Sequence, residues 1–468
     1  MTPRGSDPGA DSLGYDPVVP REECGRGGGA RVVTVPASRA CGPGAAKREH
    51  EGRRPLLAVG YGPRCVPVLE LAQAATGLCD LVWVVDESLP EMRDMGGLLD
   101  HFGVVLDLAG RTPDSVADDL ASRGVVGIVT YLDAGMVTLA EVAALLDLPF
   151  HAPAVARSLV DKARQREVLR DAGVEVPECT VLPAVPGAAA LAELKGPLHW
   201  PAVLKPRSSQ GSRWTFFARD ASCAASLLDA LGPDRPEMIM EEYIEGDPER
   251  AGGPYADYVS VESIVARGVV SHLAVTGRFP LADNFRETGF FIPAALGADE
   301  RAEVVDAAGA AIDALKVRTG CLHTEVKLTS NGPRIIEVNG RVGGGVPEML
   351  ERAAGISLLE LSMRVALGEE ARIAGPVRTE RIGYRFFLQP PAVSAIVATI
   401  EGVDAVTDLP QVDSVRIHSG PGTGIEWWEG SRSHILAVLG SARGYEELLA
   451  VERLLRDDVT VTYEGWAG

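Results

Sequence analysis

The most informative stretch of this chain is residues 320–345, which read GCLHTEVKLTSNGPRIIEVNGRVGGG. Two alternating segments flank the residues Ser330-Asn331-Gly332, and a turn of this composition between such segments indicates a β-hairpin. A strand returns to the same face at every second residue. The residues that share a face are therefore His323, Glu325 and Lys327 in the first strand, and Glu337, Asn339 and Arg341 in the second.

A hairpin centred on Asn331 would place Glu325 directly opposite Glu337. Two carboxylates in that arrangement repel each other unless a positive charge lies between them. A divalent cation would remove the conflict. The oxygens of Glu325, Glu337 and Asn339 are ligands of the kind that Mg²⁺ prefers, with phosphate oxygens and water completing the shell.

The alternative interpretation of this hairpin is a solvated strand face whose negative charges are neutralised by Lys327 and Arg341. The two strands alone support both interpretations about equally. The segment NGRVGGG, residues 339–345, favours a metal and nucleotide site. Glycines after a charged strand end allow a ligand to come close to the backbone.

Two further stretches carry candidate nucleotide contacts. Lys205 ends an apolar strand and is followed by a small polar loop that reaches Ser212, and such a loop can wrap phosphates with backbone N–H groups and hydroxyls. Residues 238–245, MIMEEYIE, could present backbone groups to adenine while the acids hold its amino group or the ribose. Each stretch alone is more typical of a solvated polar turn, as is Lys162 at a helix start.

Composition sets limits on the kind of protein. The 468 residues exceed what one hydrophobic core organises, so about two to four domains are expected. The net charge of −20 argues against nucleic acid or an anionic membrane as the main partner, since either needs a basic face. The seven scattered cysteines indicate reduced thiols rather than a disulfide framework or a zinc site. With no apolar stretch near the ~20 residues of a membrane span and no signal peptide, we expect a cytoplasmic protein.

The pattern along the chain divides it into parts. Residues 1–54 are rich in glycine and proline and are expected to form a disordered leader. Residues 55–150 alternate apolar strands with helices, which predicts a parallel sheet covered on both sides. Residues 151–375 are mostly strands with a few helices, and residues 376–468 mix both.

The order of the motifs matters more than any one of them. A helix with Lys162, a strand ending in Lys205, the segment EEYIEG, the strand YVSVE and then TEVK…IIEVNGRVGGG fall within about 190 residues. This order resembles the ATP-grasp superfamily, and within it the carboxylate–amine ligases that include bacterial L-amino acid ligases. The resemblance covers roughly residues 55–440 and is strongest over 155–345. It implies an α/β and α+β chain: an N-terminal Rossmann-like (pre-ATP-grasp) domain at 55–150, an ATP-grasp domain at 151–375 and a C-terminal α+β subdomain at 376–468.

The resemblance also implies roles for particular positions. The ATP-binding residues that it implies are Lys162, Lys205, Ser212, the hinge residues Glu241, Glu242, Tyr243 and Ile244, and the ribose-binding acid Glu249. The implied ligands of Mg²⁺ (or Mn²⁺) are Glu325, Glu337 and Asn339. Arg341 would steady the acyl-phosphate, and Glu287, within the motif RETG, would meet the amino substrate. Phe290 and Trp214 depart from the pattern, where these ligases often have histidine and glycine respectively.

The implied activity is an ATP-dependent ligation. A carboxylate, expected to be that of an amino acid, is activated as an acyl-phosphate and joined to an amine, with release of ADP and phosphate. The expected partners are these small molecules, and homodimers are common among such relatives. Two alternatives remain at this point: a bicarbonate-phosphorylating carboxylase of the same superfamily, and a nucleotide-binding pseudoenzyme.

Overall fold

The computed structural model describes residues 54–63, 65–185, 187–194, 199–232, 234–370 and 377–464. The expected leader, residues 1–54, lies outside these ranges apart from its last residue. Within the described ranges, no helix combines the length and the apolar character needed to cross a bilayer.

The N-terminal part is a four-stranded parallel sheet covered on both faces, as the alternation of strands and helices predicted. Its strand order is β3-β2-β1-β4. The strands are β1 (Leu56–Gly60), β2 (Asp80–Val85), β3 (Gly103–Asp107) and β4 (Val125–Thr130), and the helices are α1 (Val68–Ala75), α2 (Pro90–Phe102), α3 (Pro113–Arg123) and α4 (Met136–Leu145). Alternate residues of β1 and β2 enter two different hydrophobic clusters, one on each side of the sheet.

A small lobe follows, built on a four-stranded antiparallel sheet of order β5-β8-β6-β7. Helix α5 (Pro153–Val160) leads to α6 (Lys162–Asp171), which begins at Asp161, whose carboxylate accepts a hydrogen bond from the Arg164 N–H. The strands of the lobe are β5 (Cys179–Val181), β6 (Ala202–Pro206), β7 (Phe216–Ala218) and β8 (Met238–Glu242), with helices α7 (Gly187–Ala192) and α8 (Ala221–Leu231).

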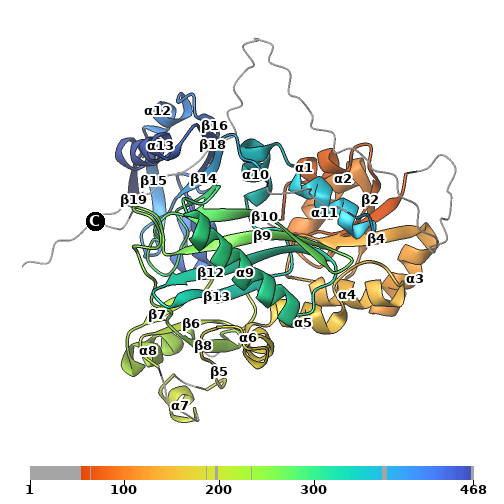
Figure 1. The fold of residues 1–468 in the computed structure, drawn as a ribbon, viewed down its shortest axis with the longest axis horizontal. Helices are drawn as coiled ribbons and strands as arrows, with labels where there is room; N and C mark the ends of the chain where they lie inside the picture. The colour runs from red at the N-terminus through yellow and green to blue at the C-terminus, as the bar shows by residue number, and fades with distance from the viewer. Residues whose placement is uncertain are drawn as a thin grey trace, which may run out of the picture.

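The centre of the molecule is an eight-stranded antiparallel sheet of order β13-β12-β9-β10-β11-β14-β18-β16. Its strands are β9 (Tyr258–Ala266), β10 (Val269–Arg278), β11 (Gly289–Ile292), β12 (Gly320–Thr329), β13 (Gly332–Asn339), β14 (Ile382–Leu388), β16 (Val412–Ile417) and β18 (Leu436–Ala442). Helix α9 (Ala298–Ala314) crosses one face of this sheet (Figure 1). Helices α10 (Val346–Ala354) and α11 (Leu358–Ala366) lead back toward the N-terminal part.

The C-terminal part does not form a separate layer. Strand β14 pairs with β11, so the large sheet continues across the boundary expected at residue 375. The remaining elements are a small sheet of order β17-β15-β19, two helices and a 3₁₀ segment. Their bounds are β15 (Ala395–Glu401), α12 (Val403–Thr407), β17 (Gly424–Ile425), the 3₁₀ segment Trp427–Ser433, α13 (Tyr445–Asp458) and β19 (Thr460–Glu464).

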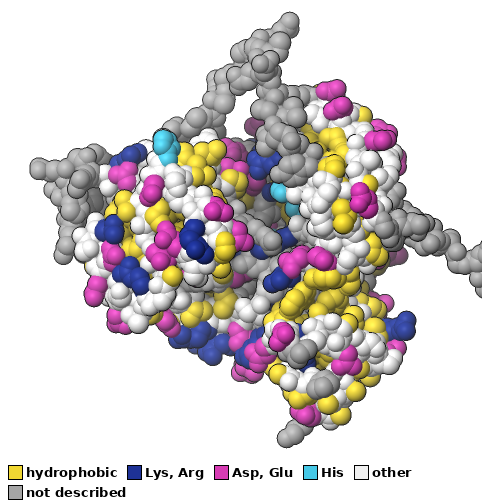
Figure 2. Space-filling view, turned by 180° about the vertical axis from the view of Figure 1, so that it is seen from behind, with side chains coloured by type: hydrophobic (Ala, Val, Ile, Leu, Met, Phe, Trp, Pro, Cys, Tyr) yellow, Lys and Arg dark blue, Asp and Glu magenta, His cyan; other side chains and the backbone are white. Residues whose placement is uncertain are grey.

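The surface view shows how charge is distributed on one side of the molecule. On the face in Figure 2, acidic and basic side chains of the described residues are interspersed. Apolar side chains gather on the small lobe, at lower right.

The contact of α10 with strand β14 depends on a glycine. A Cβ atom at Gly383 would come 2.2 Å from the Met349 carbonyl oxygen. We therefore expect Gly383→Ala to lower the free energy of unfolding by about 1–3 kcal/mol, because helix and strand must move apart. Urea denaturation followed by circular dichroism measures this. Gly424→Ala is the matched control, since a Cβ atom there meets nothing within 4 Å, and an equal loss in both variants would contradict the packing argument.

Candidate active site

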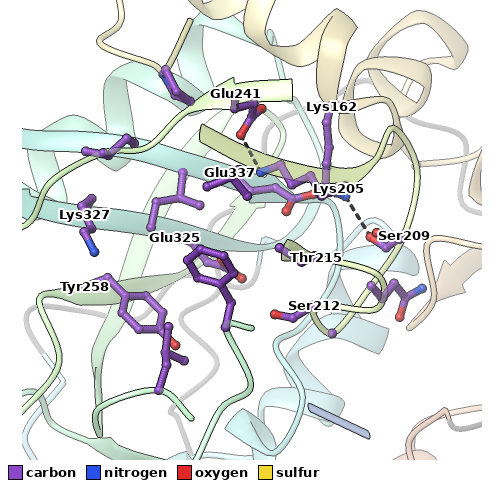
Figure 3. Close-up of a pocket in the computed structure, with 18 of the residues that line it drawn as sticks. Lys162, Lys205, Ser209, Ser212, Thr215, Glu241, Tyr258, Glu325, Lys327 and Glu337 are labelled. Carbon is purple, nitrogen blue, oxygen red and sulfur yellow. Dashed lines mark hydrogen bonds and ion pairs between the residues drawn. The ribbon is translucent and has the colours of Figure 1, made fainter. Parts of the chain in front are cut away.

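One pocket gathers almost all of the residues that the sequence singled out. It encloses about 1050 Å³ of space, part of it open to solvent, between the small lobe and the β12–β13 hairpin (Figure 3). The predicted residues that line it are Lys162, Lys205, Ser212, Glu241, Glu242, Tyr243, Ile244, Glu287, Glu325, Glu337, Asn339 and Arg341. Segments almost 180 residues apart in the chain thus meet at one cavity.

Glu249 is the predicted site residue that this pocket does not include. It lies in the turn after the hinge, its side chain is exposed, and its backbone N–H donates to Asp247 Oδ1. A ribose-binding role for Glu249 therefore stays a prediction, without support from its position.

The hairpin has the register that the metal site requires. Glu325 pairs with Glu337, and His323 pairs with Asn339. The centre of the turn differs from the expectation: Thr329 pairs with Gly332, so the turn lies between Ser330 and Asn331 rather than at Asn331.

A β-bulge corrects the register of this hairpin. Val326 pairs with Ile335, so Ile336 is an extra residue on β13. Without Ile336, the turn found here would place Glu325 opposite position 336 of a regular ladder. The bulge therefore restores the facing pair of carboxylates.

Helix α6 holds the strand that carries Glu337. Lys162, Gln165 and Arg166 lie on one face of the helix, as residues three and four apart do. The Gln165 side chain donates to the Val338 carbonyl and accepts from the Val338 N–H, both at 2.8 Å. The Arg166 guanidinium donates to the carbonyl of the bulge residue Ile336. The helix thus supplies hydrogen-bond partners to β13, which is the edge strand of the large sheet.

The two facing carboxylates have separate cationic partners. Lys162 Nζ lies 3.0 Å from Glu337 Oε1 and also donates to the Ser209 carbonyl at 2.9 Å. His323 Nε2 lies 3.6 Å from Glu325 Oε1. Burial alone would raise the pKa of Glu325, but the hydrogen bond and charge of His323 and the charge of Arg278 lower it to about 2. Glu325 is therefore negative at neutral pH.

The alternative interpretation needs Lys327 and Arg341 to neutralise Glu325 and Glu337, but both cations bind other acids. Lys327 Nζ lies 2.7 Å from Asp257 Oδ1. Arg341 holds Asp133 with two hydrogen bonds of 3.1 and 3.2 Å and donates to Asn339 Oδ1 at 3.2 Å. Glu325, Glu337 and Asn339 line the pocket together and are here called the metal wall, and their carboxylate and amide oxygens are a donor set that fits a Mg²⁺ or Mn²⁺ ion.

A buried pair behind the metal wall sets the charge of His323. Its Nδ1 lies 2.9 Å from Glu262 Oε2, and both side chains are buried. Burial would lower the pKa of His323, but the negative charge and hydrogen bond of Glu262 raise it to about 9. The imidazole is therefore protonated at neutral pH and faces Glu325 as a cation.

Both acids of the predicted adenine hinge are held in ion pairs. Glu241, which is 4% exposed, lies between Lys205 Nζ at 2.6 Å and Arg166 Nε at 3.0 Å; Figure 3 shows the contact with Lys205. Arg334 holds Glu242 with two hydrogen bonds of 3.0 Å. Contacts to adenine from this segment would thus come from backbone groups and from Tyr243 and Ile244, rather than from free carboxylates.

A further acid that lines the pocket is Glu287. Glu287 lies 3.8 Å from Arg278 Nε. Burial raises the pKa of Glu287, and the charge of Arg278 opposes that shift. The neighbouring Arg286 points away from the pocket, since it donates to the carbonyls of Asp283 and Pro390. An acid that binds a proton more readily than an exposed glutamate is suited to contact with an amine.

Sequence reasoning missed several members of the site: Arg166, Glu262, Arg278 and Asp133. Asp133 could have been found, because it follows a buried strand of the parallel sheet, the edge where ligand sites form. Arg166 and Glu262 give no such signal, since their partners Glu241 and His323 lie more than 60 residues away in the chain.

Comparison with known proteins agrees with this geometry. Residues 159–345 match the family model described as an ATP-grasp domain. The chain is 21% identical to the L-amino acid ligase of Bacillus licheniformis, with a TM-score of 0.72, and the match covers 88% of this chain and 100% of that structure. The chain therefore has the ATP-grasp fold, with its ATP-grasp domain at residues 159–345.

Two relatives are similar to this chain in sequence. The chain is 27% identical over 311 residues to the uncharacterized protein y4rH of Sinorhizobium fredii (strain NBRC 101917 / NGR234), covering 65% of this chain and 61% of that protein. It is 27% identical over 231 residues to alanine–anticapsin ligase of Bacillus subtilis (strain 168), covering 45% of this chain and 48% of the ligase. The chain thus spans less than two thirds of the length of either relative, and its relatives include amino acid ligases.

The hydrogen bonds of Gln165 to strand β13 are expected to contribute to stability. In Gln165→Leu, the buried N–H and C=O groups of Val338 would each lose a partner. Each such loss costs about 1–3 kcal/mol, so we expect a clear fall in the urea midpoint. Gln73→Leu, at an exposed position of α1, is the control. A midpoint for Gln165→Leu equal to that of the control would show that these bonds are dispensable.

The raised pKa of His323 predicts a pH dependence of stability. A group whose folded pKa lies above its unfolded value stabilises fully below the unfolded value, about 6.5, and loses that effect as pH rises through about 9. We therefore expect part of the free energy of unfolding to be lost between these pH values. Denaturation at a series of pH values measures the slope, which His323→Gln should remove and His101→Gln, at an exposed position, should keep.

Proposed function

We propose that this protein is an ATP-dependent carboxylate–amine ligase that forms an amide bond through an acyl-phosphate and releases ADP and phosphate. The observation that carries the proposal is the facing pair Glu325 and Glu337, which lines the same pocket as Lys162, Lys205 and the polar loop at 209–212. ATP-grasp homology over 159–345 and the ligases among the relatives support it.

In the first step, a carboxylate oxygen of the acid substrate attacks the γ-phosphorus of ATP, and the bond from that phosphorus to the bridging oxygen of ADP breaks. A divalent cation held by Glu325, Glu337 and Asn339 would neutralise charge on the phosphates. Lys205 and Lys162 line the pocket and offset the negative charge of the transferring group. Arg341 lines the same pocket and would steady the acyl-phosphate.

In the second step, the amine nitrogen attacks the carbonyl carbon of the acyl-phosphate and phosphate leaves. The amine must lose a proton to do so. Glu287 lines the pocket and would hold the ammonium form and accept that proton, since burial raises its pKa.

The assignment is tested by phosphate release from ATP. All proteinogenic amino acids are screened in pairs, and product mass is read alongside ADP and phosphate. We expect stoichiometric ADP, phosphate and amide for at least one pair. Phosphate release that requires bicarbonate would indicate the carboxylase instead, and nucleotide binding without turnover would indicate a pseudoenzyme.

The metal wall provides a sharper prediction. Glu337→Ala removes one of the two facing carboxylates, and we expect ADP formation to fall by at least about a hundredfold at saturating Mg²⁺. Glu351→Ala, at an exposed position of α10, is the control and should keep wild-type turnover. Normal turnover in Glu337→Ala would refute the metal assignment.

A further inference from the structure

The loop beside the phosphate site is bound by a distant part of the chain. Residues 208–215, the phosphate loop, contact the 3₁₀ segment Trp427–Ser433, here called the clamp segment. The Trp214 N–H donates to the Trp428 carbonyl at 2.8 Å, and the Ser431 N–H donates to the Gly211 carbonyl at 2.9 Å. More than 200 residues separate the two partners in each bond.

Side chains add two further links between the phosphate loop and the clamp segment. Arg213 donates to Glu429 Oε1 at 2.8 and 3.0 Å, and Arg432 donates to Gln210 Oε1 at 2.9 Å. The Arg213–Glu429 pair is partly exposed, and such pairs contribute only about 0–1 kcal/mol. The backbone bonds are therefore the contacts on which the docking mainly depends.

The closeness of the two segments depends on Gly430. Its φ is 74°, and a Cβ atom there would come 2.2 Å from the Gly211 carbonyl oxygen and 2.6 Å from the Arg213 nitrogen. On the other side, Ser212 and Trp214 have φ values of 56° and 53°, which non-glycine residues rarely adopt. Such a conformation persists where surrounding contacts hold it, and here the clamp segment supplies those contacts.

Ser431 also reaches the amine side of the pocket. Its Oγ accepts a hydrogen bond of 2.9 Å from the Glu287 N–H. The Gln389 side chain donates to the carbonyls of both Glu287 and Ser431, at 2.6 and 3.1 Å. Ser431 is buried. Its backbone N–H binds the phosphate loop, and its side chain binds the backbone of Glu287, the candidate amine-binding acid.

We propose that the clamp segment couples closure of the phosphate loop to the position of Glu287, with Ser431 as the positioning residue. This inference rests on the proposed ligase function. An acyl-phosphate is lost to hydrolysis unless the loop excludes water. The clamp segment contacts both the phosphate loop and Glu287. When the phosphate loop closes, these contacts would hold Glu287 in the position from which it binds the amine.

Hydrogen–deuterium exchange tests the coupling without requiring turnover. The full chain is measured with Mg²⁺ and a non-hydrolysable ATP analogue. Gly430→Ala pushes the clamp segment off the phosphate loop, and we expect faster exchange both at 208–215 and at 283–289. The matched control is Gly422→Ala, whose φ of 83° imposes the same backbone strain but whose Cβ atom meets nothing within 4 Å. Faster exchange at 208–215 alone, or in both variants equally, would overturn the coupling.

Ser431→Ala removes the acceptor of the Glu287 N–H and keeps the backbone bond to Gly211. We expect the KM for the amine to rise roughly fivefold, as for the loss of one hydrogen bond, with the KM for ATP unchanged and with Ser431→Thr restoring the wild-type value. We also expect the ratio of ADP to amide to rise above one in Gly430→Ala. A uniform loss of kcat with both KM values and the ratio unchanged would reduce Ser431 to a structural role. A wild-type chain that forms no amide would overturn the ligase assignment, and the exchange result would still decide the coupling.

Discussion

The hydrogen bonds and the ion pair between helix α6 and edge strand β13 are the constraint on which the rest of the site depends. Lys162, Gln165 and Arg166 contact three consecutive positions of the strand: the carboxylate of Glu337, the backbone of Val338 and the carbonyl of Ile336. Because Arg166 of α6 also binds Glu241 of the small-lobe strand β8, these contacts join the two walls of the pocket. The phosphate-facing and metal-facing sides are thereby kept in register.

Buried charge in this site is organised in chains rather than pairs. Arg166 binds both the bulge carbonyl and Glu241, and Glu241 in turn binds Lys205. Removing charges from water costs several kcal/mol per ion, so such a chain is weak evidence for stability. The chain of ion pairs instead fixes a position: the buried carboxylate of Glu241 holds the Lys205 ammonium at the wall of the pocket. A lysine on a solvated strand end would have no such anchor.

The sequence predicted the parts of the site that depend on local periodicity. Strand alternation about a turn centred on Asn331 predicted that Glu325 faces Glu337, and the alternating elements predicted the parallel N-terminal sheet. The structure reaches the Glu325–Glu337 pairing by another route, a turn between Ser330 and Asn331 together with the unpredicted bulge at Ile336. The ion pairs of Glu241 and Glu242 could not be predicted, since their partners come from α6 and β13, far along the chain. The boundary at residue 375 follows a change in sequence texture, yet strand pairing between β11 and β14 carries the large sheet across it.

The bulge at Ile336 has a consequence for how this hairpin can change in length. On the turn side of the bulge Ile335 enters the hydrophobic core, while its neighbour Ile336 lines the pocket. The extra residue, Ile336, interrupts the alternation of side chains between the two faces of the strand, so that Ile336 and Glu337 both face the pocket. A one-residue insertion or deletion in the turn would move either the core isoleucine or the carboxylate to the wrong side of the sheet. A one-residue change of strand length between the turn and Ile336 would therefore need a matching change at the bulge to keep Ile335 and Glu337 on their present sides of the sheet.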